Sequence, residues 1–166
     1  MIDNGSSVEL VGILSQYCNC ISIDIRPLMA KVDGLSGCLA SVLQLPFAND
    51  SIKFLTSMCV LEHIGLGRYG DKLNPNGTDK AVHEISRVIT PGGIVVYSVP
   101  IGRFITEFNA HRWFTYEKAS ILFTDWDLID SVALIPYPTS FSSNDDLMNT
   151  YNDPVGCFCV PKPKSD

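Results

Sequence analysis

The chain has 166 residues and a formal net charge of −6 at pH 7, with 46% hydrophobic and 18% charged residues. This length suits one domain with one core, and the composition favours elements that are buried on both faces. The lysines and arginines are scattered, so we expect no nucleic-acid partner. No run approaches the ~20 apolar residues of a membrane span, and the N-terminus lacks the layout of a signal peptide. We therefore expect a cytoplasmic protein without a membrane span, and we leave a homodimer open.

The first half of the chain alternates predicted helices and strands. Apolar residues at helical spacing predict a helix over 8–16, directly after the small residues Gly5-Ser6-Ser7. Short apolar runs at 20–25 and 52–60 are bounded by turn residues, and both suit buried parallel strands.

The second half continues this alternation. Apolar residues on one face predict a helix over 78–89, which Pro91-Gly92-Gly93 ends before a strand over 94–99. One short helix and two strands follow, over 117–123, 126–134 and 155–160. The chain therefore predicts an α/β fold with a doubly wound, mostly parallel sheet over 1–166. Because a polar loop over 136–154 and no helix separates the last two strands, we expect an antiparallel C-terminal edge strand.

Six cysteines lie within or beside apolar runs, and we interpret them as buried free thiols. A zinc site made by the pairs Cys18-x-Cys20 and Cys157-x-Cys159 is the alternative. It requires two pairs that are far apart in the sequence to converge. We expect no metal.

The first turn and the end of the next strand carry the first chemical signals. Gly5 allows backbone N–H groups to approach a ligand closely, and the following helix start favours a negative group. Asp24 ends the predicted strand about twenty residues later, where a carboxylate can accept both hydroxyl hydrogens of a ribose. The alternative is that Asp24 pairs with Arg26 or caps the next turn.

Three segments occur in an order and spacing that resemble the class I S-adenosylmethionine-dependent methyltransferases. They are Gln44-Leu-Pro-Phe-Ala-Asn-Asp-Ser-Ile-Lys-Phe, Val60-Leu-Glu-His-Ile and Glu84-Ile-Ser-Arg-Val-Ile-Thr-Pro-Gly-Gly. With the glycine turn and Asp24, the resemblance spans roughly residues 2 to 100. The later segment Phe108-Asn-Ala-His-Arg resembles a little-characterised branch of that superfamily.

The resemblance implies a Rossmann-like methyltransferase fold and S-adenosylmethionine as the cofactor. Asp3 and Gly5 would face the methionine part, Asp24 would hold the ribose, and residues 39–43 would line the adenine. Ser41 stands where many relatives carry an aspartate that contacts the adenine. The predicted cofactor-binding residues are Asp3, Gly5, Ser6, Asp24, Ser41, Val42 and Cys59.

For function, the resemblance implies methyl transfer to a small molecule or sugar. If the acceptor must lose a proton, His63 and His111 lie at the carboxyl edge of the predicted sheet and could act as the base. Arg112 is the predicted anion anchor for the substrate, and Tyr69 could shape the acceptor pocket. Each histidine could equally be structural, and Glu62 could cap a helix start.

Only Met1 and Ile2 precede the glycine turn, whereas a central strand normally has about five residues, so we expect a first strand that is cut short. Residues 161–166 are predicted to fray. The second hypothesis is a catalytically silent binding module of the same fold. An NAD-dependent oxidoreductase ranks last, because the sequence lacks a full G-x-G-x-x-G turn.

Overall fold

The computed structural model describes residues 1–134, 139–140 and 154–164. Most of the predicted polar loop over 136–154 therefore lies outside the described residues. Within the described part of the chain, no helix has the length and apolar character that a membrane crossing needs.

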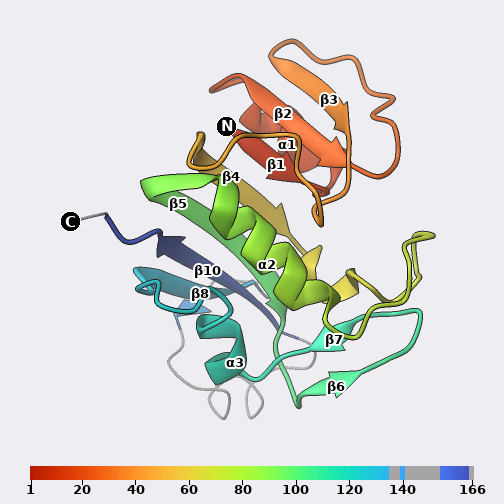
Figure 1. The fold of residues 1–166 in the computed structure, drawn as a ribbon, viewed down its shortest axis with the longest axis vertical. Helices are drawn as coiled ribbons and strands as arrows, with labels where there is room; N and C mark the ends of the chain where they lie inside the picture. Colours follow the sequence, from red (N-terminus) through yellow and green to blue (C-terminus); the bar gives the residue numbers. More distant parts are fainter. Residues whose placement is uncertain (135–138, 141–153, 165–166) are drawn as a thin grey trace.

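A single mixed sheet runs through the centre of the protein (Figure 1). The described residues give it eight strands in the order β3-β2-β1-β4-β5-β10-β8-β9. Their bounds are β1 Ile2–Asn4, β2 Cys20–Asp24, β3 Leu35–Leu39, β4 Ile52–Met58, β5 Ile89–Pro100, β8 Asp130–Leu134, β9 Thr139–Ser140 and β10 Val155–Pro161. Strands β3, β2, β1, β4 and β5 are parallel to one another, while β10 is antiparallel to both β5 and β8. This arrangement confirms the doubly wound, mostly parallel sheet with an antiparallel C-terminal strand, and it inserts that strand between β5 and β8.

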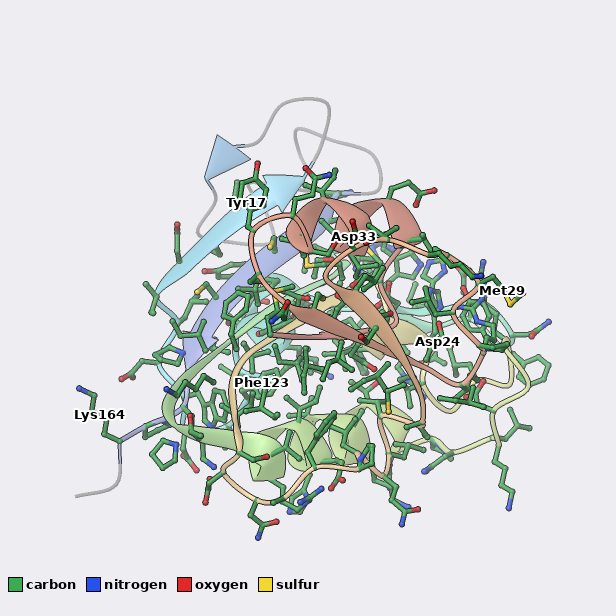
Figure 2. All side chains as sticks on the ribbon, turned by 90° about the horizontal axis from the view of Figure 1, so that it is seen from above. Tyr17, Asp24, Met29, Asp33, Phe123 and Lys164 are labelled. Carbon is green, nitrogen blue, oxygen red and sulfur yellow. The ribbon has the colours of Figure 1, made fainter. Side chains whose placement is uncertain are left out.

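Helices cover both faces of the sheet, and Figure 2 shows α1 and α2 on opposite sides of it. The helical segments are α1 Val8–Leu14, the 3₁₀ turn η1 Leu61–His63, α2 Gly77–Val88 and α3 Tyr116–Ser120. A small hairpin of β6 (Ile105–Thr106) and β7 (Arg112–Trp113) stands apart from the main sheet.

The helix starts and the core follow from local sequence chemistry. Ser7 caps α1 by accepting a hydrogen bond from the Leu10 amide, as the cap-friendly residues before this helix predict. The apolar face of α2 is buried against the sheet, with Ala81, Ile85 and Val88 at 0% exposure. The apolar periodicity predicts a helix over 78–89, and α2 begins and ends one residue earlier, at Gly77 and Val88.

Two predictions about the chain need correction. Among the six cysteines only Cys20 is fully buried, and Cys18 and Cys59 are exposed, so the expectation of buried thiols is wrong for most of them, although all six are free. The tail does not fray at 161–162, because β10 continues to Pro161 and Lys162 Nζ donates to Asp50 Oδ1 at 2.6 Å and to the Ile89 carbonyl at 2.7 Å.

Candidate functional site

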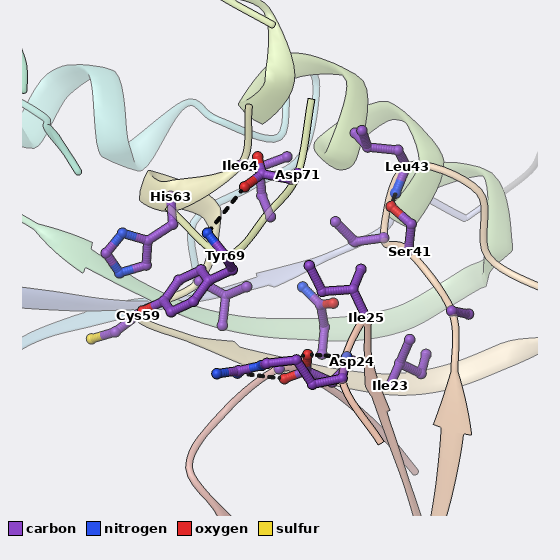
Figure 3. A pocket seen from close by; sticks show the side chains of 16 residues that line it. Ile23, Asp24, Ile25, Ser41, Leu43, Cys59, His63, Ile64, Tyr69 and Asp71 are labelled. Atoms are coloured by element: carbon purple, nitrogen blue, oxygen red, sulfur yellow. Dashed lines mark hydrogen bonds and ion pairs between the residues drawn. The ribbon is translucent and has the colours of Figure 1, made fainter. Parts of the chain in front are cut away.

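A cleft lies at the carboxyl ends of β1, β2 and β4 (Figure 3). After β1 the chain continues outward through β2 and β3, whereas β4 and β5 extend the sheet on the other side of β1. Strand order therefore reverses next to β1, and such switch points are where doubly wound sheets bind ligands. The predicted site residues that line this cleft are Gly5, Asp24, Ser41, Val42, Cys59, His63 and Tyr69.

Gly5 keeps the floor of the cleft open at the turn after β1. Its φ is +65°, a conformation that side chains other than glycine adopt at a cost. A Cβ atom at this position would come within 3.3 Å of a Val60 methyl group and 3.9 Å of Asp24 Oδ2. The turn is held by the Gly5 amide, which donates to the Ile23 carbonyl at 2.8 Å.

Asp3 stabilises that turn through hydrogen bonds and does not line the cleft. The fully buried carboxylate accepts hydrogen bonds from the Ser6 hydroxyl at 2.6 Å and from Thr56 Oγ1 at 2.7 Å. Burial raises its pKa, and these hydrogen bonds act in the opposite direction. The Ser6 hydroxyl also accepts from the Met58 amide at 3.0 Å, so it joins the turn to β4. Their positions support a structural role for both residues rather than direct contact with a ligand in the cleft.

The carboxylate of Asp24, at the end of β2, is engaged by Arg26. Oδ1 accepts from the Arg26 amide at 2.8 Å and from its Nε at 3.0 Å, while Oδ2 accepts from Nη2 at 2.7 Å. Burial alone would raise the pKa of Asp24, but the hydrogen bonds and charge of Arg26 outweigh it and hold that pKa below the usual value. The pairing that the sequence left open as an alternative is therefore present.

Residues 40–43 form one wall of the cleft, after the end of β3. The wall is largely apolar, with Ala40, Val42 and Leu43 beside the hydroxyl of Ser41. That hydroxyl accepts from the Leu43 amide at 3.2 Å, so it tightens the local turn. An apolar wall next to a carboxylate suits a flat base attached to a sugar diol.

The 3₁₀ turn η1 and the loop between η1 and α2 form the opposite wall, where His63 of η1 and Tyr69 of the loop face the cleft (Figure 3). Asp71 fixes this loop by accepting from the Gly65 amide at 2.6 Å. The ring of Tyr69 packs edge-on against His63, with 5.5 Å between centroids. The guanidinium of Arg26 lies 4.8 Å from the centre of the same ring, so the segment directly after β2 and this loop are in contact across the cleft.

Three ionisable side chains lie close together beside Tyr69, namely those of Glu62, His63 and His111. His63 Nδ1 lies 2.7 Å from the Ala110 carbonyl, which can only accept, so Nδ1 carries the hydrogen. His63 Nε2 lies 3.7 Å from Glu62 Oε1, and the ring of His111 is 6.1 Å from that of His63. Glu62 Oε2 and His111 Nε2 are buried and have no hydrogen-bond partner among the described residues. Burial raises the pKa of Glu62 to about 8 and lowers the pKa of His63.

Arg112 is not placed as an anion anchor, and we correct that prediction. Its side chain is buried and donates to backbone carbonyls, with Nη1 at 2.7 Å from the Ile64 oxygen and Nη2 at 3.3 Å from the Pro75 oxygen. Nη1 also donates to the Thr78 hydroxyl at 3.2 Å. Arg112 therefore holds together the loop that leads from η1 into α2.

Sequence reasoning missed part of the cleft and part of its surroundings. Ile25 and Ile64 add apolar surface to the cleft. The only sequence signals were that Ile25 follows a strand end and that Ile64 is the last residue of the segment Val60-Leu-Glu-His-Ile. Cys59 was predicted from the resemblance, but its φ of +55° directly after β4 was not foreseen. Glu62 carried no sequence signal for burial, because acidic residues are rarely buried without a partner.

Comparison with solved structures defines the class of fold. The chain is similar to the methyltransferase in "Complex between the Haloferax volcanii Trm112 methyltransferase activator and the putative methyltransferase", with TM-score 0.69, 16% identity, and coverage of 99% of this chain and 82% of that one. It is also similar to the N-methyltransferase NodS of Bradyrhizobium japonicum in complex with S-adenosyl-L-homocysteine, with TM-score 0.68, 14% identity, and coverage of 98% and 77%. The [4+2]-cyclase SpnF gives TM-score 0.70 at 13% identity, with coverage of 99% and 74%. The fold is therefore the class I methyltransferase fold, as the resemblance implies.

The sequence also matches a family model over residues 8–145, described as "Caenorhabditis protein of unknown function, DUF268". The chain belongs to this family. No curated protein matches the sequence.

Proposed function

We propose that the protein binds S-adenosylmethionine in the cleft and transfers its methyl group to a small molecule or sugar, without a metal. The observation that supports this most is the position of the Asp24 carboxylate at the switch point, between the Gly5 turn and the apolar wall over 40–43. The similarity to NodS, whose structure contains S-adenosyl-L-homocysteine, adds support at the level of the fold.

The residues present fit such a cofactor. Asp24 offers two acceptor oxygens for the ribose hydroxyls, and Ala40 to Leu43 offer apolar surface for the adenine. Gly5 leaves room beside Val60 for the part of the ligand that joins the nucleoside to its amino-acid tail. When bound, S-adenosylmethionine supplies a methyl group activated by a positively charged sulfur.

Two histidines can take the proton that an acceptor O–H or N–H loses during transfer. His63 Nε2 lies 3.7 Å from Glu62 Oε1. His111 Nε2 is buried without a hydrogen-bond partner among the described residues, so His111 can act as the base only if this nitrogen becomes accessible to the acceptor. Only His63 lines the cleft itself. Replacing each histidine by alanine and following the transfer rate against pH separates the two assignments. Tyr69 remains the proposed contact for the acceptor.

The second candidate is a binding module that holds the nucleoside without catalysis. It is favoured by Arg112, the predicted substrate anchor, which is fully engaged in the scaffold. A module of this kind would bind the cofactor and its demethylated product without turnover in a broad acceptor screen, whereas the enzyme would release S-adenosyl-L-homocysteine.

Calorimetric titration of Asp24→Asn with S-adenosyl-L-homocysteine tests the proposed ligand site. The substitution removes the charge that accepts the ribose hydroxyls, so we expect affinity to fall by roughly 10-fold or more. Asp33→Asn is the matched control, because Asp33 is an exposed aspartate outside the cleft lining, and it should bind like the wild type. Equal affinity of wild type and Asp24→Asn would contradict the ribose assignment.

A further inference from the structure

Two hollows meet at Asp24 and Arg26. The first is the cleft already described, and the second lies beside the start of α1 and is lined by Ser6, Ser7 and the segment 27–30. Gly5, Asp24 and Arg26 line both of them. A ligand that carries a nucleoside in the first hollow and a tail in the second must therefore pass these three residues.

Arg26 occupies the position through which such a ligand would run. Its guanidinium holds both oxygens of Asp24, at 3.0 Å from Oδ1 through Nε and 2.7 Å from Oδ2 through Nη2. The same guanidinium lies against the ring of Tyr69 on the opposite wall. The side chain thus connects the end of β2 with the η1–α2 loop, and it uses the acceptor atoms that a ribose diol needs.

Separating the Arg26 side chain from Asp24 requires little free energy. The side chain of Arg26 is 59% exposed and that of Asp24 is 23% exposed, and exposed ion pairs add little stability because water and salt screen them. When the guanidinium leaves, the backbone amide of Arg26 still donates to Asp24 Oδ1 at 2.8 Å. The carboxylate therefore stays oriented while Oδ2 and a further lone pair of Oδ1 become available.

We infer that Arg26 is an affinity-determining residue that competes with the ligand's diol for Asp24 and divides one elongated binding site into two hollows. This inference rests on the proposed function, because the competing ligand is the nucleoside of that cofactor. Binding then requires the Arg26 side chain to leave Asp24 and the Tyr69 ring. The free energy needed to displace Arg26 therefore weakens ligand binding by the wild-type protein.

The test is calorimetric titration of wild type, Arg26→Met and Lys80→Met with S-adenosyl-L-homocysteine. Methionine keeps an apolar stem over Tyr69 and removes every side-chain donor to Asp24, so Arg26→Met should bind roughly twofold to fivefold more tightly than wild type. Lys80→Met removes one exposed positive charge of α2, away from both hollows, and should bind like wild type. Raising the salt concentration from about 0.05 M to about 0.5 M should strengthen wild-type binding and leave Arg26→Met unchanged, because salt weakens the competing pair.

The outcomes separate this inference from the proposed function. Tighter binding by Arg26→Met alone, or binding by Arg26→Met where wild type shows none, supports the competition. Equal or weaker binding by Arg26→Met, with measurable binding by wild type, overturns the competition and leaves the proposed function intact. Absence of binding by all three proteins overturns both, because no nucleoside then competes for Asp24.

Discussion

Single residues around the cleft have ionisation properties that depend on folding, and Glu62 shows this most clearly. Its side chain is 1% exposed, Oε2 has no partner among the described residues, and burial raises its pKa from 4.5 to about 8. A carboxyl group with this pKa is protonated in the folded protein at neutral pH, so it can donate a hydrogen bond where a carboxylate could only accept. Its neighbour His63, with a lowered pKa, is neutral under the same conditions.

Glu62→Gln tests this state through the pH dependence of stability. Because the folded pKa lies above the unfolded value of 4.5, the stabilising contribution is fully present below pH 4.5 and is lost as the pH rises to about 8. The loss amounts to at most roughly 3 to 5 kcal/mol. Glutamine does not titrate, so the free energy of unfolding of Glu62→Gln relative to wild type should increase between about pH 5 and pH 8.

Denaturant unfolding at several pH values measures this difference, with Glu107→Gln as the control. Glu107 is exposed, and its substitution should leave the pH profile of the wild type unchanged. Parallel profiles for wild type and Glu62→Gln would show that Glu62 ionises in the folded protein as it does in the unfolded chain.

At the level of elements, apolar patterns predict α2, β2 and β10 well, but β5 begins at Ile89, before the predicted stop at Pro91-Gly92-Gly93. Helix α2 is found almost as predicted because its buried face repeats every three to four residues. Strand β3 was missed because the apolar residues of Leu35-Ser-Gly-Cys-Leu neither alternate nor form a continuous run, and the strand is partly exposed. The two-residue strands of the β6–β7 hairpin are defined only by their mutual pairing. The positions of Gly5 and Asp24 in the cleft could be predicted because they follow directly from the local strand ends. The role of Arg112 could not, because it depends on contacts with carbonyls about 40 residues away in the sequence.

Arg112→Met tests whether this arginine holds the η1–α2 loop. The substitution leaves the carbonyls of Ile64 and Pro75 without their donor, so we expect a loss of roughly 2 to 4 kcal/mol in the free energy of unfolding. Arg103→Met, at an exposed arginine of the same region, should change stability by less than about 0.5 kcal/mol. A small effect of Arg112→Met in thermal or denaturant unfolding would return Arg112 to the list of ligand contacts.

For the whole molecule, the sheet order and the position of the cleft say more about the ligand than the name of the fold does. The chain shares its fold with proteins named as methyltransferases and with one named as a cyclase, and one fold supports unrelated reactions. The apolar wall over 40–43 and the Asp24 carboxylate are the features on which the proposed nucleoside ligand rests. Binding of a nucleoside and transfer of a methyl group are therefore tested separately, because the proposed transfer requires the binding site.

The proposed nucleoside site in the cleft is tested most directly by an amide-shift NMR titration of the isotope-labelled protein with S-adenosyl-L-homocysteine, with NADH as the control ligand. We expect saturable shifts that cluster at the carboxyl ends of β1, β2 and β4 and in the wall over 40–43, including Gly5, Ile25 and Leu43. The Kd should be roughly 1 to 100 μM, with no comparable response to NADH. A folded protein whose spectrum does not change, or whose shifts cluster at β8 and β10, would contradict the proposed site.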